Sequence, residues 1–322
     1  PRILAFSPTT QQMPTLPIRI RHAAEGLGGR VLSDERRIGV ERWMRGFLES
    51  RRLRNADVAV VSFGKSGRTW LRVLLSRLYQ QKFDLPPGAL IEFDNLHRLN
   101  PEVPKIFFTH DNYLRDFTGH DGEKRAYRGT PVVLLARDPI DVAVSQYFQW
   151  QHRMRPHKML INRYPRADSG ISMHEFVSGE AAGAPKVIGF LNDWAESFTV
   201  LETLLLVRYE DMRANTHMQL RRVVDFLGTI ATDAEIDDAV QYASFENMRK
   251  RETQASHESE RLAATDRDNP DSYKSRRGKV GGYRDYFTEE EIAALKRIQF
   301  SQLDPAYGYA TRMATTTQSM SD

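Results

Sequence analysis

The stretch GKSG at residues 64–67 lies between the apolar run DVAVVSF and a segment with helical spacing, TWLRVLLSRLY. A glycine-rich turn between a buried strand and a helix N-terminus presents free backbone N–H groups to a phosphate-like anion. The N–H groups near Gly67, Arg68 and Thr69 are expected to hold such an anion. The loop of nucleotide triphosphatases would require a glycine at Ala59, so the pattern disfavours a P-loop kinase.

Two further segments place cations where an anion could bind. Arg137 directly follows the apolar run PVVLLA, and Ser145 comes eight residues later in a helix-like segment. A guanidinium at a strand end can hold a phosphate through two parallel hydrogen bonds, and a nearby hydroxyl can add a third. In SRRGKVGGYRDYFT, at 275–288, Arg276 and Arg277 precede a glycine, which suits a second anion clamp. Taken alone, each segment also fits a solvated basic turn or an ordinary strand end.

Together these segments resemble, in chain order, the motifs of cytosolic sulfotransferases. That family moves the sulfuryl group of 3′-phosphoadenosine 5′-phosphosulfate (PAPS) to an acceptor hydroxyl and leaves 3′-phosphoadenosine 5′-phosphate (PAP). The 5′-phosphosulfate loop is similar to KSGRTW at 65–70, and the 3′-phosphate segment is similar to LLARDPIDVAVSQYFQW at 134–150. The family's C-terminal basic motif is similar to 275–288, and VRYEDM at 207–212 and SFENM at 244–248 also match.

The resemblance runs from about Asp57 to Thr288 and implies a PAPS site that needs no metal. It implies that Lys65 is catalytic and stabilises the leaving phosphate. It also implies that Trp70 and Phe245 stack on the adenine. The full set implied for the cofactor is Lys65, Ser66, Gly67, Arg68, Thr69, Trp70, Arg137, Ser145, Tyr209, Phe245, Arg276, Arg277 and Gly278.

His110 ends the run PKIFFTH and matches the family's Lys-Thr-His, which implies that it is the general base, with Asp111 in reserve. A histidine with an ordinary pKa near 6.5 accepts a proton at neutral pH. Phe108 stands where the family usually carries a lysine. Because that cation is missing, we expect the pKa of His110 to lie not far below about 6.5.

Short apolar runs alternate with helix-length segments along the chain. The runs DVAVVSF, KIFFTH, PVVLLAR and TLLLVRYED are apolar at successive positions, as in parallel strands covered on both faces. This predicts an α/β fold, a P-loop-like open parallel sheet flanked by helices, with sites at the carboxyl ends of the strands. We expect a single domain at 57–310, preceded by a basic helical extension at 1–56 and followed by a polar tail at 311–322. The polar stretch 252–273 reads as a long loop.

The composition, with 40% hydrophobic residues, no cysteine and no apolar run long enough for a bilayer, favours a globular protein of the cytoplasm. Residues 1–56 hold eleven arginines against five acidic residues. They include a predicted amphipathic helix with Ile38, Trp43, Phe47 and Met44 along one face, expected to pack on the domain. Peripheral membrane contact through this helix is the alternative. Nucleic-acid binding is not expected, because basic and aromatic residues do not alternate.

The acceptor is predicted only as a small molecule, lipid or glycan with a hydroxyl. One aromatic and basic group of residues suits an anionic or glycan-bearing acceptor, and equally a solvated lid: Tyr147, Phe148, Trp150, Arg153, Arg155, His157 and Lys158. Two other functions stay open, a P-loop kinase-like phosphotransferase and a non-catalytic PAPS- or PAP-binding protein, which Phe108 favours. The family's dimer motif is not visible, so the oligomeric state is open.

Overall fold

The computed structural model describes residues 33–119, 124–254, 269–273 and 276–309. The first 32 residues of the expected extension, most of the expected loop at 252–273 and the expected tail lie outside these ranges. Residues 252–254 of that loop belong instead to helix α12 (Phe245–Gln254), so the predicted loop begins too early. Among the described residues, no helix combines the length and the apolar character needed to cross a bilayer.

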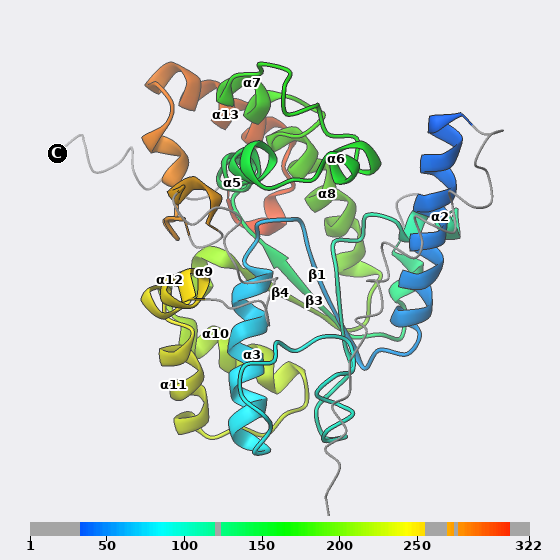
Figure 1. The fold of residues 1–322 in the computed structure, drawn as a ribbon, viewed down its shortest axis with the longest axis vertical. Coiled ribbons are helices and arrows are strands. Elements are labelled where there is room, and N and C mark those ends of the chain that lie inside the picture. The colour runs from blue at the N-terminus through cyan, green and yellow to red at the C-terminus, as the bar shows by residue number, and fades with distance from the viewer. Residues whose placement is uncertain (1–32, 120–123, 255–268, 274–275, 310–322) are drawn as a thin grey trace, which may run out of the picture.

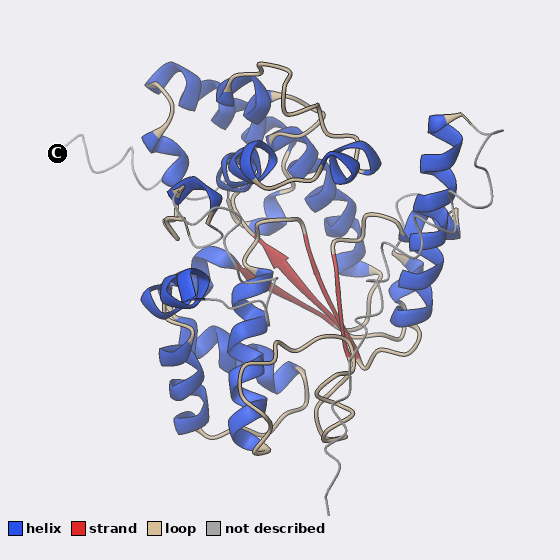
Figure 2. Cartoon of the chain, in the orientation of Figure 1, coloured by secondary structure: helices blue, strands red, loops and turns tan. Residues whose placement is uncertain are grey.

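Four parallel strands form one sheet in the order β2-β1-β3-β4. Val60 of β1 lies opposite Phe108 of β2 on one side and Val133 of β3 on the other. Every residue of the two central strands is buried, because helices cover both faces of the sheet (Figures 1 and 2). The predicted α/β fold with an open parallel sheet is confirmed. The strands are β1 (Val58–Ser62), β2 (Ile106–Thr109), β3 (Val132–Ala136) and β4 (Leu204–Arg208).

The two faces of the sheet carry separate cores. Val60 and Val133 point into one core with helices α3, α10 and α11, whereas Val61 and Leu134 point into the other with α8. Figure 1 shows these groups of helices on opposite sides of the strands. Besides α12, the helices are α2 (Asp34–Leu53), α3 (Arg68–Lys82), α4 (Leu114–Thr118), α5 (Pro139–His152), α6 (Pro156–Ile161), α7 (Met173–Ser178), α8 (Ala184–Ala195), α9 (Tyr209–Ala214), α10 (Thr216–Phe226), α11 (Asp233–Tyr242) and α13 (Glu289–Gln302).

Helix α2 packs against the short helix α4, as expected of a helix that belongs to the globular body (Figure 1). The predicted apolar face is only partly buried: Trp43 and Phe47 contact the ring of Phe117 in α4, yet Trp43 remains 47% exposed. Glu41 and Arg42 are buried beside it, which was not predicted. The charged pair is buried because both find partners: Arg42 donates two hydrogen bonds to Asp116 of α4, and Glu41 accepts from Arg45. The helix thus turns polar side chains toward the domain.

Candidate functional site

The loop between β1 and α3 has the backbone of an anion-binding turn. Lys65 has φ +72° and Gly67, the N-cap of α3, has φ +93°. A Cβ at Gly67 would lie 2.9 Å from the ring of Tyr209, so only glycine fits this position without a shift. No side chain caps α3 and no acidic residue lies in its first turn, so its positive end is left for an anion.

A cavity of about 510 Å³ opens over this loop, and its lining residues His110, Arg137 and Tyr209 directly follow β2, β3 and β4. Ten cations and a single carboxylate, Asp141, line it together with Trp70, Tyr209 and Phe245. Such a lining suits a ligand with several negative charges and a flat ring. The cations of this first cavity are Lys65, Arg68, Arg72, Arg137, Arg153, Lys158, Arg213, Arg276, Arg277 and Lys279.

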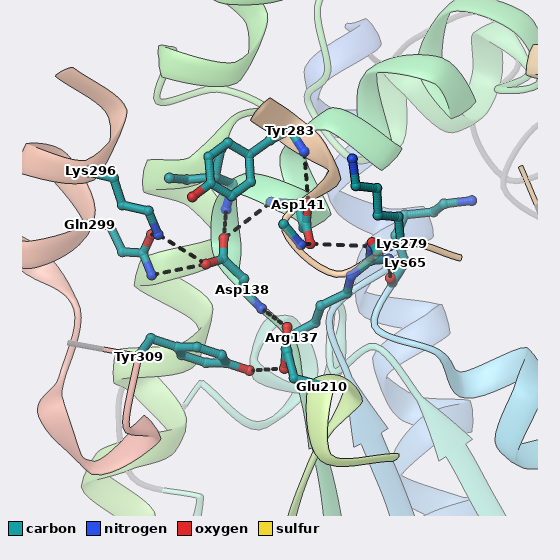
Figure 3. A network of polar contacts seen from close by, with 12 residues as sticks. Lys65, Arg137, Asp138, Asp141, Glu210, Lys279, Tyr283, Lys296, Gln299 and Tyr309 are labelled. Carbon is teal, nitrogen blue, oxygen red and sulfur yellow. Dashed lines mark hydrogen bonds and ion pairs between the residues drawn. The ribbon is translucent and has the colours of Figure 1, made fainter. Parts of the chain in front are cut away.

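Arg137 joins the loop to the C-terminal segment (Figure 3). Its guanidinium donates to the carbonyl of Lys65 at 3.2 Å and lies 4.3 Å from the ring centre of Tyr209. It also lies 3.6 Å from Asp141, which accepts hydrogen bonds from the backbone N–H groups of Gly281 and Tyr283. Burial raises the pKa of Asp141. Asp141 therefore ties the C-terminal motif to α5 beside Arg137, a role that the sequence analysis did not assign.

Asp138 is the N-cap of α5. Its carboxylate accepts from the backbone N–H groups of Ile140 and Asp141 at 2.9 and 3.3 Å. The same carboxylate accepts from Lys296 and Gln299 of α13 (Figure 3). The carboxylate of Asp138 therefore both caps α5 and anchors α13 through Lys296.

The C-terminal basic pair rests on aromatic side chains. The guanidinium of Arg276 lies 3.7 Å from the ring centre of Phe148, and Arg277 is 48% exposed. Gly278 has φ +60°, and a Cβ there would lie 2.7 Å from the ring of Phe245. The glycine thus lets the basic segment approach the aromatic wall of the first cavity closely.

His110 accepts a hydrogen bond in this structure. Its Nδ1 lies 2.7 Å from the carbonyl oxygen of Ser62, which can only accept, so Nδ1 carries the proton. Nε2 is left as the acceptor, and Arg68 Nη2 lies 2.6 Å from it. Burial and the charge of Arg68 lower the pKa of His110 well below 6.5. The expectation of a pKa not far below 6.5 is wrong, because the imidazole is buried and because Arg68 supplies a neighbouring cation in place of a lysine at 108.

The structure gathers the predicted cofactor residues in the first cavity with one exception. Ser66 is 2% exposed and is not among the lining residues. The lining includes Lys65, Gly67, Arg68, Thr69, Trp70, Arg137, Ser145, Tyr209, Phe245, Arg276, Arg277 and Gly278, with His110.

Some expectations for the acceptor region are wrong, and several lining cations were not predicted, among them Arg72, Arg213 and Lys279. Trp150 and Phe148 belong to a buried core, whereas Arg153 and Lys158 line the first cavity. Arg72, which the sequence analysis left out, also lines it. Its spacing of four from Arg68 was the available signal, since such residues share a helix face.

A second cavity of about 390 Å³ borders the first. Gly64, His110, Gln149 and Lys158 line both, so the imidazole lies between them. Asp111, the reserve base, lines the second cavity but is already engaged: it pairs with Lys124 and accepts from the Tyr127 hydroxyl, both at 2.9 Å. Within the described ranges, no three His, Asp or Glu side chains gather as metal ligands.

Residues 55–304 match the sulfotransferase domain family. Among curated proteins, the chain is 26% identical to flavonol 3-sulfotransferase of Flaveria bidentis, over 78% of this chain and 85% of that protein. It is 29% identical to cytosolic sulfotransferase 13 of Arabidopsis thaliana, over 73% of each chain. Among solved structures, mouse sulfotransferase SULT7A1 complexed with PAP aligns with a TM-score of 0.52 and 20% identity, over 77% of this chain and 84% of that one.

The chain therefore belongs to the sulfotransferase family, since the family match covers most of its length. The predicted family and class of enzyme are confirmed, and the structural likeness supports the same fold.

Proposed function

We propose that this chain transfers the sulfuryl group of PAPS to a hydroxyl of a small molecule, lipid or glycan. The first cavity is the observation that supports PAPS as the donor, because ten cations and one carboxylate line it together with three aromatic rings. A solved structure supports it, since the mouse enzyme is complexed with PAP. Relatives named cytosolic support a place in the cytoplasm. We take residues 57–310 as the catalytic domain, since the family match covers residues 55–304.

PAPS, when bound, supplies the sulfuryl group and the leaving phosphate. The first-turn N–H groups of α3 and the side chain of Lys65 would hold the 5′-phosphate. The adenine would lie among the rings of Trp70, Phe245 and Tyr209, which line one cavity. The 3′-phosphate would take the remaining predicted donors: Arg137, Ser145, Arg276, Arg277 and Gly278.

His110 would remove the proton from the acceptor hydroxyl. Nε2 has the free lone pair for this step, because Nδ1–H donates to the Ser62 carbonyl. Arg68 now donates to Nε2, so the hydroxyl must take the place of its guanidinium. A displaced Arg68 stays in the first cavity, where its charge favours an anionic ligand.

Arg72 offers a replacement for the lysine missing at Phe108. Its guanidinium lies 4.0 Å from the ring centre of Phe108 and lines the first cavity. Stacking on an aromatic ring holds a guanidinium in one orientation without neutralising its charge. We expect Arg72 to stabilise negative charge on the transferring group.

Two measurements test this function against its alternatives. Calorimetric titration with PAP alone, and separately with ATP and magnesium, distinguishes a sulfotransferase from a kinase-like phosphotransferase. Tight binding of PAP without metal is expected, and binding of ATP with magnesium alone would contradict the proposal. A screen with radiolabelled PAPS then separates an enzyme from a non-catalytic PAP-binding protein, which would bind PAP yet label no acceptor.

A further inference from the structure

The second cavity carries more positive charge than its neighbours neutralise. Six cations and two carboxylates, Asp111 and Asp193, line it. Lys124 pairs with Asp111 at 2.9 Å, and Arg42 pairs with Asp116 at 2.8 Å. When these two pairs are set aside, four lining cations remain beside one carboxylate, Asp193. The four cations are Arg115, Lys158, Arg163 and Lys186.

Among these four cations, Lys186 of α8 has its ammonium group beside uncharged partners. Nζ donates to the carbonyl oxygens of Ala181 and Asn162 at 2.8 and 3.1 Å and lies 4.1 Å from the ring centre of Tyr164. None of the carboxylates that the structure describes forms an ion pair with it. Carbonyls and a ring orient the ammonium without neutralising its charge.

Like charges surround the two lysines. Burial, followed by the charges of Arg42 and Arg163, lowers the pKa of Lys186 to about 8. Burial, followed by the charge of Arg68 and more distant arginines, also lowers the pKa of Lys158. An anion bound among these groups would relieve their mutual repulsion, which is the electrostatic condition for anion recognition.

The rest of the wall is apolar and aromatic. Phe63 and Phe190 meet edge to face with ring centres 5.5 Å apart, and both line the cavity with Leu114 and Met154. Lys186 lines the second cavity and not the first, whereas His110 lines both cavities. A ligand in the second cavity can thus present one end to His110 while its body meets the apolar wall and another part meets Lys186.

We propose that the second cavity binds an acceptor carrying, besides its reacting hydroxyl, an anionic group held by Lys186 and Arg163. The group is a carboxylate, phosphonate or phosphate on an apolar or aromatic body. This inference rests on the proposed function, because it takes His110 as the site of the reacting hydroxyl. It narrows the acceptor from any hydroxyl compound to hydroxylated anions.

Matched probe pairs test the charge requirement. Para-hydroxyphenylacetate is compared with its amide, and para-hydroxybenzylphosphonate with its dimethyl ester. Binding to the PAP-loaded protein is measured by calorimetry, and sulfation with PAPS is measured in parallel. At least one anionic probe should bind about tenfold or more tightly than its neutral partner. If no anionic probe binds better than its neutral partner, the inference is wrong.

Variants test the residues. Lys186→Gln should weaken binding of the preferred anion about tenfold and leave its neutral partner unchanged. Arg163→Asn should act in the same direction, and asparagine tolerates the φ of +56° at this position. Lys250→Gln, at an exposed position of α12 and outside both cavities, is the matched control and should change neither. Equal weakening of both probes, or of neither, by Lys186→Gln would overturn the assignment.

PAP affinity separates the two proposals. It is measured in the parent protein and in each variant, and it should remain unchanged because Lys186 and Arg163 do not line the first cavity. A parent protein that fails to bind PAP contradicts the proposed function. A parent that binds PAP but shows no preference for anionic probes contradicts this inference alone.

Discussion

At the scale of single residues, burial and then the charge of Arg68 lower the pKa of His110, and the residue at 108 is not among the causes. Because the pKa is lowered, the imidazole stays neutral and competent as a base as the pH falls through 6.5. We expect the acid limb of kcat/KM well below pH 6.5. His110→Ala should abolish that limb and reduce turnover by roughly 10²- to 10⁴-fold while PAP affinity changes little.

Arg68→Met is the companion variant for this pH profile. Removal of the neighbouring cation should raise the pKa of His110, so the acid limb should move toward higher pH. If the activity of the parent protein falls to half at pH 6.5 or above as the pH is lowered, the assignment of a lowered pKa to His110 is contradicted. So would a His110→Ala variant that keeps the acid limb, since another group would then be the base.

Arg72 is predicted to matter for turnover more than for binding. Arg72→Met should lower kcat by about 10- to 100-fold, because a fixed charge beside the transferring group acts mainly in the transition state. Arg72→Lys should keep part of the rate. Arg77→Met is the control on the same helix, since Arg77 pairs with Asp238 and lines neither cavity. Parent-like turnover in Arg72→Met would remove Arg72 from the mechanism.

The gathering of the proposed cofactor residues in one cavity could be predicted, because these residues occur in short motifs at strand ends. Arg137 and Tyr209 directly follow their strands, so a correct strand assignment places them at one edge of the sheet. The roles of Arg68 and Asp141 could not be predicted in this way. Each depends on a contact across the fold, with His110 of the next strand and with the backbone of Gly281, and spacing along the chain does not reveal such contacts.

At the scale of elements, the sheet was predictable and the orientation of α2 was not. Continuous apolar runs such as that of β1 fix a buried strand, because no polar position faces solvent. The apolar residues of α2 suggested that Trp43 faces the domain. Glu41 and Arg42 are buried beside it, since Asp116 and His157 offer them partners that lie far away in the sequence.

The buried Glu49 of α2 should make the stability of the folded protein depend on pH. Burial and the charge of Asp111 raise its pKa to about 8, so the folded chain holds this proton where the unfolded chain, at 4.5, does not. Stability should fall as the pH rises from about 4.5 to about 8 and then level off, because only the unfolded state ionises freely in that window.

Glu49→Gln tests this coupling. Glutamine keeps the shape and removes the ionisation, so it should stabilise the protein at pH 8 by on the order of 3 kcal/mol, a few degrees in Tm. At pH 5 the gain should nearly vanish. Urea unfolding at the two pH values measures the difference. A variant that is equally stabilised or destabilised at both values would show that Glu49 does not titrate as inferred.

At the scale of the whole molecule, positive charge is concentrated around the first cavity. The full chain has a formal net charge of only +4, yet ten cations and one carboxylate surround the first cavity. Clustered like charges destabilise a folded protein and focus an attractive field on an anion. Binding of a polyanion should therefore stabilise the entire fold, and added salt should weaken this effect.

The thermal shift caused by PAP tests that coupling. Ligand at 100 times its Kd stabilises a protein by about 2.7 kcal/mol, which raises Tm by several degrees. Arg137→Ala removes a charge-assisted phosphate contact and should raise Kd about tenfold or more. At the same PAP concentration it should then keep about half of that stabilisation or less. Arg128→Ala, exposed and outside both cavities, should respond to PAP like the parent. Because Arg137 also bonds the Lys65 carbonyl, the ligand-free Tm of each variant is the reference. An undiminished PAP shift in Arg137→Ala would place the phosphates elsewhere in the cavity.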